Sequence, residues 1–130
     1  MGFRFGFDAI TGDYKVVSFL LCRNEAEIFS LNETRLNCIS VSCIPPEAVH
    51  CKYAKDVFLN GVIHWICNTK SSFFILTFDV HGEFLGTMST PSDPITKPDF
   101  AMVEIDELKD CLALCCHLGE EGCTIWRMAE

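Results

Sequence analysis

The chain has 130 residues, of which 49% are apolar and eleven are phenylalanine, and it carries a net charge of −8 at pH 7. Such an apolar composition excludes an intrinsically disordered chain, and the length fits one domain or part of a larger one. With 18 acidic residues against 10 basic ones, the chain is not expected to bind nucleic acid, because that affinity rests on neutralising phosphates.

The first predicted unit covers residues 3–41 and contains four short strands. They are expected at residues 3–8, 14–22, 27–31 and 35–41, with glycine, asparagine and aspartate in the turns between them. In the second strand Val16 and Leu20 point one way and Val17 points the other. A sheet exposed on one side alternates apolar with polar residues, so both faces of this strand are predicted to be buried.

The second predicted unit covers residues 56–89, with strands at residues 56–59, 62–67, 74–78 and 83–89. Asn60-Gly61 joins the first two of these strands and is the strongest turn signal in the chain, because a type I′ turn needs positive φ at both central positions. The third unit covers residues 101–130, with strands at residues 101–106, 111–117 and 124–128, and its fourth strand is missing.

Two landmarks repeat at the same offsets through these units. Asp13, Asn60 and Asp110 stand 47 and 50 positions apart, and so do Ile28, Ile75 and Ile125. Four short strands in a unit of about 50 residues is the period of kelch-type repeats, and apolar strands buried on both faces fit sheets stacked as propeller blades.

The sequence therefore predicts an all-β protein, a partial kelch-like β-propeller of about three four-stranded antiparallel blades with the third blade incomplete. Residues 1–130 are expected to form a single propeller fragment, with residues 42–53 and 91–98 as loops between blades.

No sequence signal points to a membrane or to secretion. The longest apolar runs, residues 16–22 and 73–78, are far shorter than the roughly 20 residues that a membrane-spanning helix needs. The first residues lack the basic and then apolar segments of a signal peptide. We expect a protein of the cytoplasm or nucleus with no membrane partner, in which the nine cysteines are reduced and several are buried.

Four short motifs together resemble a known family. They are FGFDAITGDYKVV at residues 5–17, VFLNGVIHW at residues 57–65, ILTFD at residues 75–79, and LAL at residues 112–114 followed by IWRM at residues 125–128. In this order and spacing they resemble the F-box-associated domain of plant F-box proteins, and the resemblance covers nearly the whole chain.

The resemblance implies a kelch-related β-propeller that serves as the substrate-recognition domain of an SCF-type ubiquitin ligase. Its partner would be a protein target whose identity the sequence does not give. A Skp1-type adaptor would bind only a longer form that carries an F-box, because the F-box itself is expected to be absent from this chain.

Several cysteine and histidine residues are candidates for metal or catalytic sites. The candidate metal cluster consists of Cys111, Cys115, Cys116, His117 and Cys123. Zinc sites usually present close pairs such as Cys-x₂-Cys on turns, and this spacing has none, so buried thiols are favoured and no metal is expected.

The pairs His50-Cys51 and His64/Cys67 lack any group that would orient a base or bind an oxyanion. A structural hydrogen bond is therefore expected for His64. No catalytic residue, no cofactor and no enzymatic activity are predicted.

The partner-binding surface is expected on loops at one end of the blades. The candidate loops are residues 8–13, 45–53 and 92–99, and individual binding residues cannot be assigned. Two alternatives to an interaction module remain open. One is a truncated gene product without independent function, whose open blades expose apolar faces. The other is a carbohydrate-binding propeller, which would need carboxylates near a central channel.

Overall fold

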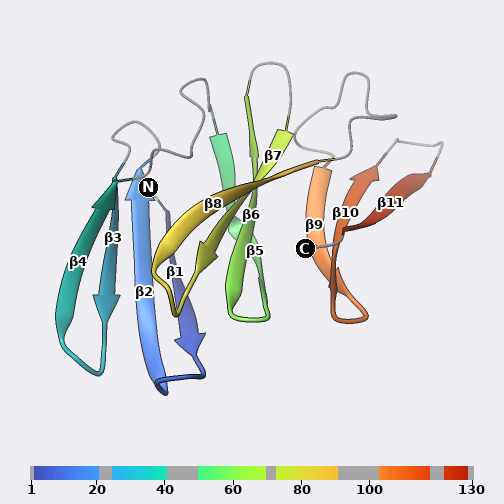
Figure 1. The fold of residues 1–130 in the computed structure, drawn as a ribbon. Coiled ribbons are helices and arrows are strands. Elements are labelled where there is room, and N and C mark those ends of the chain that lie inside the picture. Colours follow the sequence, from blue (N-terminus) through green and yellow to red (C-terminus); the bar gives the residue numbers. More distant parts are fainter. Residues whose placement is uncertain are drawn as a thin grey trace.

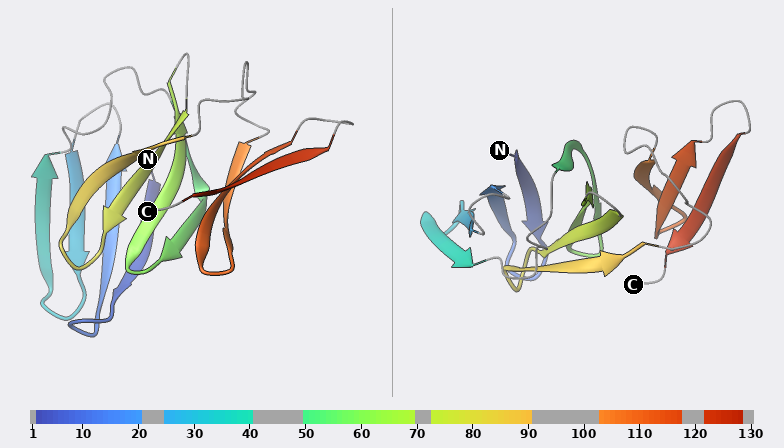
Figure 2. Two further views of the ribbon diagram at one scale, coloured as in Figure 1. Left: turned by 45° about the vertical axis from the view of Figure 1, so that its right-hand side comes forward. Right: turned by 90° about the horizontal axis from the view of Figure 1, so that it is seen from above.

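The computed structural model describes residues 2–20, 25–40, 50–69, 73–90, 103–117 and 122–128. Within these residues the chain forms three antiparallel sheets of four, four and three strands and contains no helix. The sheets follow one another side by side in chain order (Figures 1 and 2). The predicted all-β fold of propeller-like blades is thus confirmed. In this part of the chain no helix has the length and hydropathy that crossing a membrane requires.

Each blade consists of neighbouring strands joined in sequence. The first blade contains β1 (Gly2–Asp8), β2 (Asp13–Leu20), β3 (Glu25–Ser30) and β4 (Arg35–Ser40). The second blade contains β5 (His50–Leu59), β6 (Val62–Asn68), β7 (Phe73–Asp79) and β8 (Phe84–Ser89). The third blade contains β9 (Val103–Leu108), β10 (Cys111–His117) and β11 (Cys123–Met128), and β10 lies between the other two.

The β5–β6 turn has the conformation that its sequence predicts. Asn60 and Gly61 have φ angles of 52° and 77°, which is the left-handed geometry of a type I′ turn. This turn brings Leu59 and Val62 into register as the closing pair of the hairpin.

The start of β5 corrects one predicted boundary. Residues 50–53, expected as part of the loop 42–53, belong to β5, and the β5–β6 register is interrupted between Cys51 and Asp56. An irregularity of this kind lets one long strand bend along its partner. It also interrupts the regular alternation of side chains by which a strand is predicted from sequence.

The first two blades pack face to face around one apolar cluster. The cluster contains Val17, Ala26 and Ile28 from the first blade and Ile63, Trp65, Cys67, Phe74, Leu76, Phe78 and Val80 from the second. The largest of these side chains, Trp65 and Phe78, come from the second blade. At Gly6 the fit is so close that an added Cβ would lie 2.5 Å from Cγ2 of Val80.

A second apolar cluster joins the second and third blades. It contains Val57, Leu59, Ile66 and Ile75 from the second blade and Val103, Ile105, Leu112, Leu114 and Cys116 from the third. The middle blade is therefore covered on both sides, and five consecutive residues of β6, from Ile63 to Cys67, are buried. Two-faced burial is confirmed for β6.

Two-faced burial is wrong for the first blade. Val17 is fully buried against the second blade, whereas the opposite face of β1, β2 and β4 is exposed. The large apolar side chains on that face are Phe3, Phe5, Phe7, Tyr14 and Leu36. No described sheet covers this face, and we call it the outer aromatic face.

Backbone pairing also corrects the repeat. The N–H of Leu31 donates to the carbonyl of Tyr14, and the N–H of Val80 donates in the same way to Gly61. Tyr14 and Gly61 are 47 positions apart, as expected, but Leu31 and Val80 are 49 positions apart. Equivalent positions in the third strands of the first two blades are thus two residues further apart in sequence than Ile28 and Ile75. Because side chains in a strand repeat every two residues, this shift leaves the same face inward.

Candidate functional site

Three turns lie at one end of the first two blades, and residues of all three line a cavity. The turns are residues 9–12 between β1 and β2, residues 60–61 between β5 and β6, and residues 80–83 between β7 and β8 (Figure 1). The cavity has a volume of about 470 Å³. It is lined by Phe7, Asp8, Ala9, Ile10, Phe58, Asn60, Gly61, Asp79, Val80 and His81. We call it the turn pocket.

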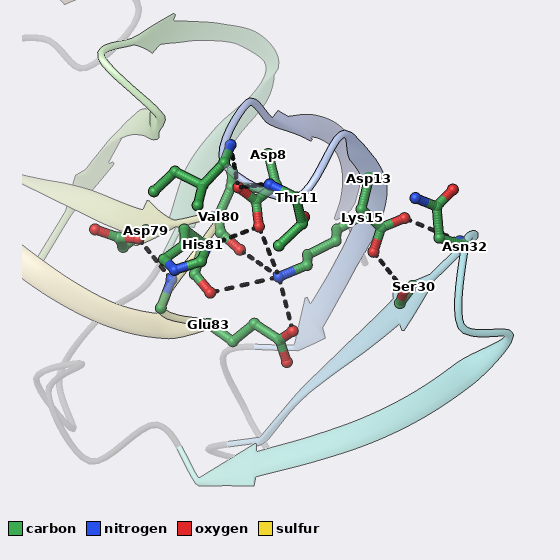
Figure 3. A network of polar contacts seen from close by, with 12 residues as sticks. Asp8, Thr11, Asp13, Lys15, Ser30, Asn32, Asp79, Val80, His81 and Glu83 are labelled. Atoms are coloured by element: carbon green, nitrogen blue, oxygen red, sulfur yellow. Dashed lines mark hydrogen bonds and ion pairs between the residues drawn. The ribbon is translucent and has the colours of Figure 1, made fainter.

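Buried beside the turn pocket is Lys15 of β2, whose side chain is only 6% exposed. Its Nζ lies 2.9 Å from a Glu83 carboxylate oxygen and 3.4 Å from Oδ2 of Asp8. It also donates to the carbonyl of Val80 at 2.9 Å. Figure 3 shows the ammonium group between the two carboxylates. One cation of the first blade thus holds the β7–β8 turn of the second.

Asp8 ends β1 and is almost completely buried. Burial opposes its ionisation, but hydrogen bonds from His81, from Thr11 and from the backbone N–H of Ile10 outweigh burial and hold its pKa well below the ordinary value. The ionised carboxylate lies 2.9 Å from Nδ1 of His81. Because a carboxylate only accepts hydrogen bonds, Nδ1 carries a hydrogen and Nε2 is the ring nitrogen that remains for other contacts.

Glu83 lies in the β7–β8 turn at φ 56° and joins three side chains of the first blade. Arg35 of β4 reaches it at 2.7 Å, Lys15 at 2.9 Å, and the amide of Asn37 at 3.4 Å. The hydrogen bond from Arg35 is the main reason why the pKa of Glu83 falls to about 2, against the opposing effect of burial. The same pair raises the pKa of Arg35.

A second carboxylate fixes the neighbouring turn of the first blade. Asp13 accepts hydrogen bonds from the hydroxyl of Ser30 and, at 2.9 Å, from the backbone N–H of Asn32. The hydrogen bond from Ser30 is the main cause of its lowered pKa. Asp13 therefore ties β2 to the β3–β4 turn and has a structural role beside the pocket.

The lining of the turn pocket is mainly apolar, and its polar residues are Asp8, Asn60, Asp79 and His81. Phe58 and Ile10 are exposed there, whereas the ring of Phe7 packs beside Tyr14 on the outer aromatic face. Asp79 accepts the backbone N–H of Gly82 with Oδ1 at 2.8 Å, and the side chain of His81 is half exposed. The described lining contains no hydroxyl, thiol or amine nucleophile. This arrangement is suited to binding a ligand.

The structure describes one of the three predicted binding loops. Of residues 8–13, residues 8–10 line the turn pocket, and binding of a partner by this loop stays a prediction. Residues 45–49 and 92–99 lie outside the described residues, and residues 50–53 are part of β5.

Sequence reasoning missed His81, Asp79 and Phe58. His81 falls between the strands predicted at residues 74–78 and 83–89, where polar turn residues are usually solvated. The available signal was Lys15, a cation between apolar residues in an inner strand, since a buried charge needs partners nearby.

The cysteine and histidine candidates are separated by the fold. Cys116 packs in the cluster between the second and third blades, while Cys111 and Cys115 lie on the opposite face of β10. His117 is exposed, 3.9 Å from a carboxylate oxygen of Glu104. Among the described residues no three His, Cys, Asp or Glu side chains are close enough together to hold a metal ion. The side chain of Cys123 is outside the description.

Two further expectations concern single residues. His64 is buried and its Nδ1 lies 3.1 Å from the carbonyl of Val57, so the predicted structural hydrogen bond is confirmed. The expectation of reduced cysteines is wrong at Cys67, which is in a disulfide. The reduced thiols described are those of Cys38, Cys111, Cys115 and Cys116.

The chain is similar to known proteins over most of its length. The chain matches the model of the F-box associated beta propeller domain over residues 1–128. It is similar to a putative F-box protein of Arabidopsis thaliana, with 30% identity over 111 residues that cover 79% of this chain and 28% of that protein.

Two F-box/kelch-repeat proteins of Arabidopsis thaliana are also similar to the chain. One is 25% identical over 132 residues, which cover 98% of this chain and 36% of that protein. The other is 29% identical over 126 residues, which cover 95% and 30%. The chain spans about a third of the length of these relatives. No solved structure gives a significant match.

Proposed function

Because the chain belongs to the F-box associated beta propeller domain family, we propose that it recognises the protein target of an SCF-type ubiquitin ligase. In this proposal the blades bind the target, and other subunits carry out the transfer of ubiquitin. The chain itself acts as a protein-interaction module and catalyses no reaction.

The observation that carries this proposal is the position of the turn pocket. Propellers commonly bind partners through the loops at one end of their blades. The turn pocket lies at such an end, between two blades, and combines exposed Ile10 and Phe58 with polar residues. Exposed apolar side chains around a hollow are typical of an interaction site.

We further propose that a Skp1-type adaptor binds only a form of the protein that carries an F-box. Support comes from the relatives, which are described as F-box proteins and extend well beyond the region matched here. The proposed place of action is the cytoplasm or nucleus.

The proposal can be tested by fusing the chain to the F-box segment of one Arabidopsis relative and reconstituting the ligase with purified subunits. Proteins captured by the unfused chain in plant extract serve as candidate substrates. We expect at least one of them to be ubiquitinated by the fusion and not by the F-box segment alone. If no captured protein is ubiquitinated above that control, the proposed function is wrong.

The outer aromatic face favours a second reading, in which the chain by itself has no independent function. Exposed apolar faces promote association, so this reading predicts oligomers or low solubility for the chain alone. Light scattering and a thermal melt decide between the two readings. A soluble monomer with one cooperative transition contradicts the second reading.

A further inference from the structure

We propose that two copies of the chain complete one six-bladed ring, in which the third blade of each copy packs on the first blade of the other. The inference goes beyond the proposed function, because it concerns how the chain covers its own open faces. Propellers contain about four to eight blades, and the described residues form three sheets. Two copies together supply six.

The outer aromatic face of the first blade is equivalent to a buried face of the second. The backbone N–H groups of Leu31 and Val80 bond to equivalent carbonyls of the two blades, and Phe29 and Phe78 stand two positions before them. Val80 and Phe78 are buried against the first blade, at 0% and 1% exposure. Leu31, by contrast, is 48% exposed, and Phe29 is half-buried. The first blade thus has the residues of a contact between blades without the contact.

The exposed face of the third blade is equivalent to the other buried face of the second. Leu108 closes the β9–β10 hairpin as Leu59 closes the β5–β6 hairpin, and Ile125 of β11 takes the place of Ile75 of β7. Leu59 and Ile75 are buried against the third blade, whereas Leu108 and Ile125 are 45% and 56% exposed. At this end of the chain, too, a face typical of blade contacts is left open.

These equivalences make the two open faces a matching pair. Along the stack the forward face of each blade, which points to the next blade in sequence, packs on the backward face of that blade. The outer aromatic face is the open backward face, and the exposed face of the third blade is the open forward face. They belong to the blades at the two ends of the row (Figure 2). Glu104 and Asp106 lie at the β9 edge of the forward face, and a polar rim commonly surrounds an apolar contact.

A ring of two copies uses both open faces of each copy. Contacts between two unlike faces are heterologous, and they give a closed ring or an open filament according to the rotation that relates the copies. In the six-bladed ring every forward face packs on a backward face, so the apolar side chains of both are removed from water. This burial of apolar surface drives the association.

The first test is the mass of the purified chain, measured by light scattering at increasing concentration. We expect a discrete species with twice the mass of one chain, which grows no further because the closed ring has no open face. A monomer at every concentration would overturn the proposal and leave both faces to another partner. Oligomers that keep growing would also overturn it, and they are the outcome predicted by the reading in which the chain has no independent function.

Two variants locate the contact. Phe5→Glu places a charge on the outer aromatic face, where Phe5 is 60% exposed, and Ile125→Arg places one on the exposed face of the third blade. We expect each to raise the dissociation constant of the dimer by more than about tenfold, because the contact would bury a charge without a partner. Circular dichroism checks that each variant keeps its sheets.

The matched control is Phe84→Glu. Phe84 is 58% exposed, nearly as much as Phe5, but it belongs to the second blade and lies on neither open face. We expect this variant to remain a dimer. If Phe84→Glu dissociates the dimer as strongly as Phe5→Glu does, the assignment of the contact is wrong.

Mixing the two variants tests whether unlike faces pair. In each variant alone, both contacts of the ring carry one altered face. The mixed dimer has one unaltered contact and one in which the introduced carboxylate meets the introduced guanidinium, so we expect the mixture to recover a dimer. A mixture that stays monomeric would contradict the ring. So would an Ile125→Arg variant that dimerises as the unsubstituted chain does, because the first blades would then pack on each other.

Discussion

The two contacts between blades differ in their polarity. Between the second and third blades the described contact is an apolar cluster. Between the first and second blades an apolar cluster of similar size is accompanied by ion pairs that cross from one blade to the other. These pairs join Arg4 to Asp56, and Lys15 and Arg35 to Glu83.

The difference bears on how the turn pocket is positioned. Apolar burial is non-directional and holds two sheets together without fixing how their turns are aligned. The carboxylate of Glu83 can satisfy Lys15 and Arg35 together in only one alignment of the β7–β8 turn on the first blade. The polar contact thus sets the geometry of the turn pocket, whereas the apolar contact supplies cohesion alone.

The largest expected effect is that of removing the buried cation. In Lys15→Met the carboxylates of Asp8 and Glu83 stay buried without their cation, and breaking a buried pair in this way costs about 3–5 kcal/mol of unfolding free energy. Urea denaturation measures this loss. Lys109→Met changes an exposed lysine in the β9–β10 turn, and we expect it to alter stability by less than about 0.5 kcal/mol.

A slightly smaller loss is expected at the apolar contact. Leu114→Ala opens a cavity between the second and third blades and should cost about 3 kcal/mol. Ile125→Ala in the same blade removes an exposed side chain and should cost much less. If the two substitutions have equal effects in urea denaturation, the third blade does not pack on the second through this face.

Close packing at the first contact predicts a cost for a single added methyl group. In Gly6→Ala the new Cβ meets Val80, and overpacking of this kind costs about 1–3 kcal/mol. Val80→Ala makes room for it. The double variant should therefore be more stable than the sum of the two single effects predicts, and simple additivity would argue against this contact.

The smallest effect is the pH dependence that Glu83 contributes. A carboxyl whose pKa is lower in the folded than in the unfolded chain stabilises the fold above the unfolded value. For Glu83 these values are about 2 and 4.5, so its contribution is complete above pH 5 and is lost as the pH falls from 4.5 towards 2. Asp8 and Asp13 act in the same direction.

Melting temperatures between pH 6 and pH 2 measure this dependence. We expect Glu83→Gln to lower the melting temperature at pH 6 and to have a shallower decline with falling pH than the unsubstituted chain. Parallel declines would show that Glu83 is not held by Arg35 and Lys15.

The sequence predicts the blades well because their signals are local. Turn residues such as Asn60-Gly61 and apolar strands such as β6 follow directly from backbone preference and burial. The outer aromatic face was mispredicted because the apolar pattern of β2 is the same whether or not a neighbouring sheet covers it.

The turn pocket was only partly predictable, because it depends on contacts between distant residues. Residues 8–10 of the predicted loop 8–13 line the pocket, but His81 is 73 positions from Asp8 and joins it only when the blades stack. The disulfide of Cys67 was missed for a related reason. Expectations about cysteines came from the cellular compartment, whereas pairing depends on which residues the fold brings together.

A double-mutant cycle between Lys15 and Glu83 tests most directly whether the polar contact aligns the first two blades. The residues are 68 positions apart in sequence, so they interact only if the β7–β8 turn docks on β2. For Lys15→Met, Glu83→Gln and the double variant, urea denaturation should give a coupling free energy of about 1–3 kcal/mol. Additive effects within about 0.3 kcal/mol would contradict the docked turn and, with it, the turn pocket.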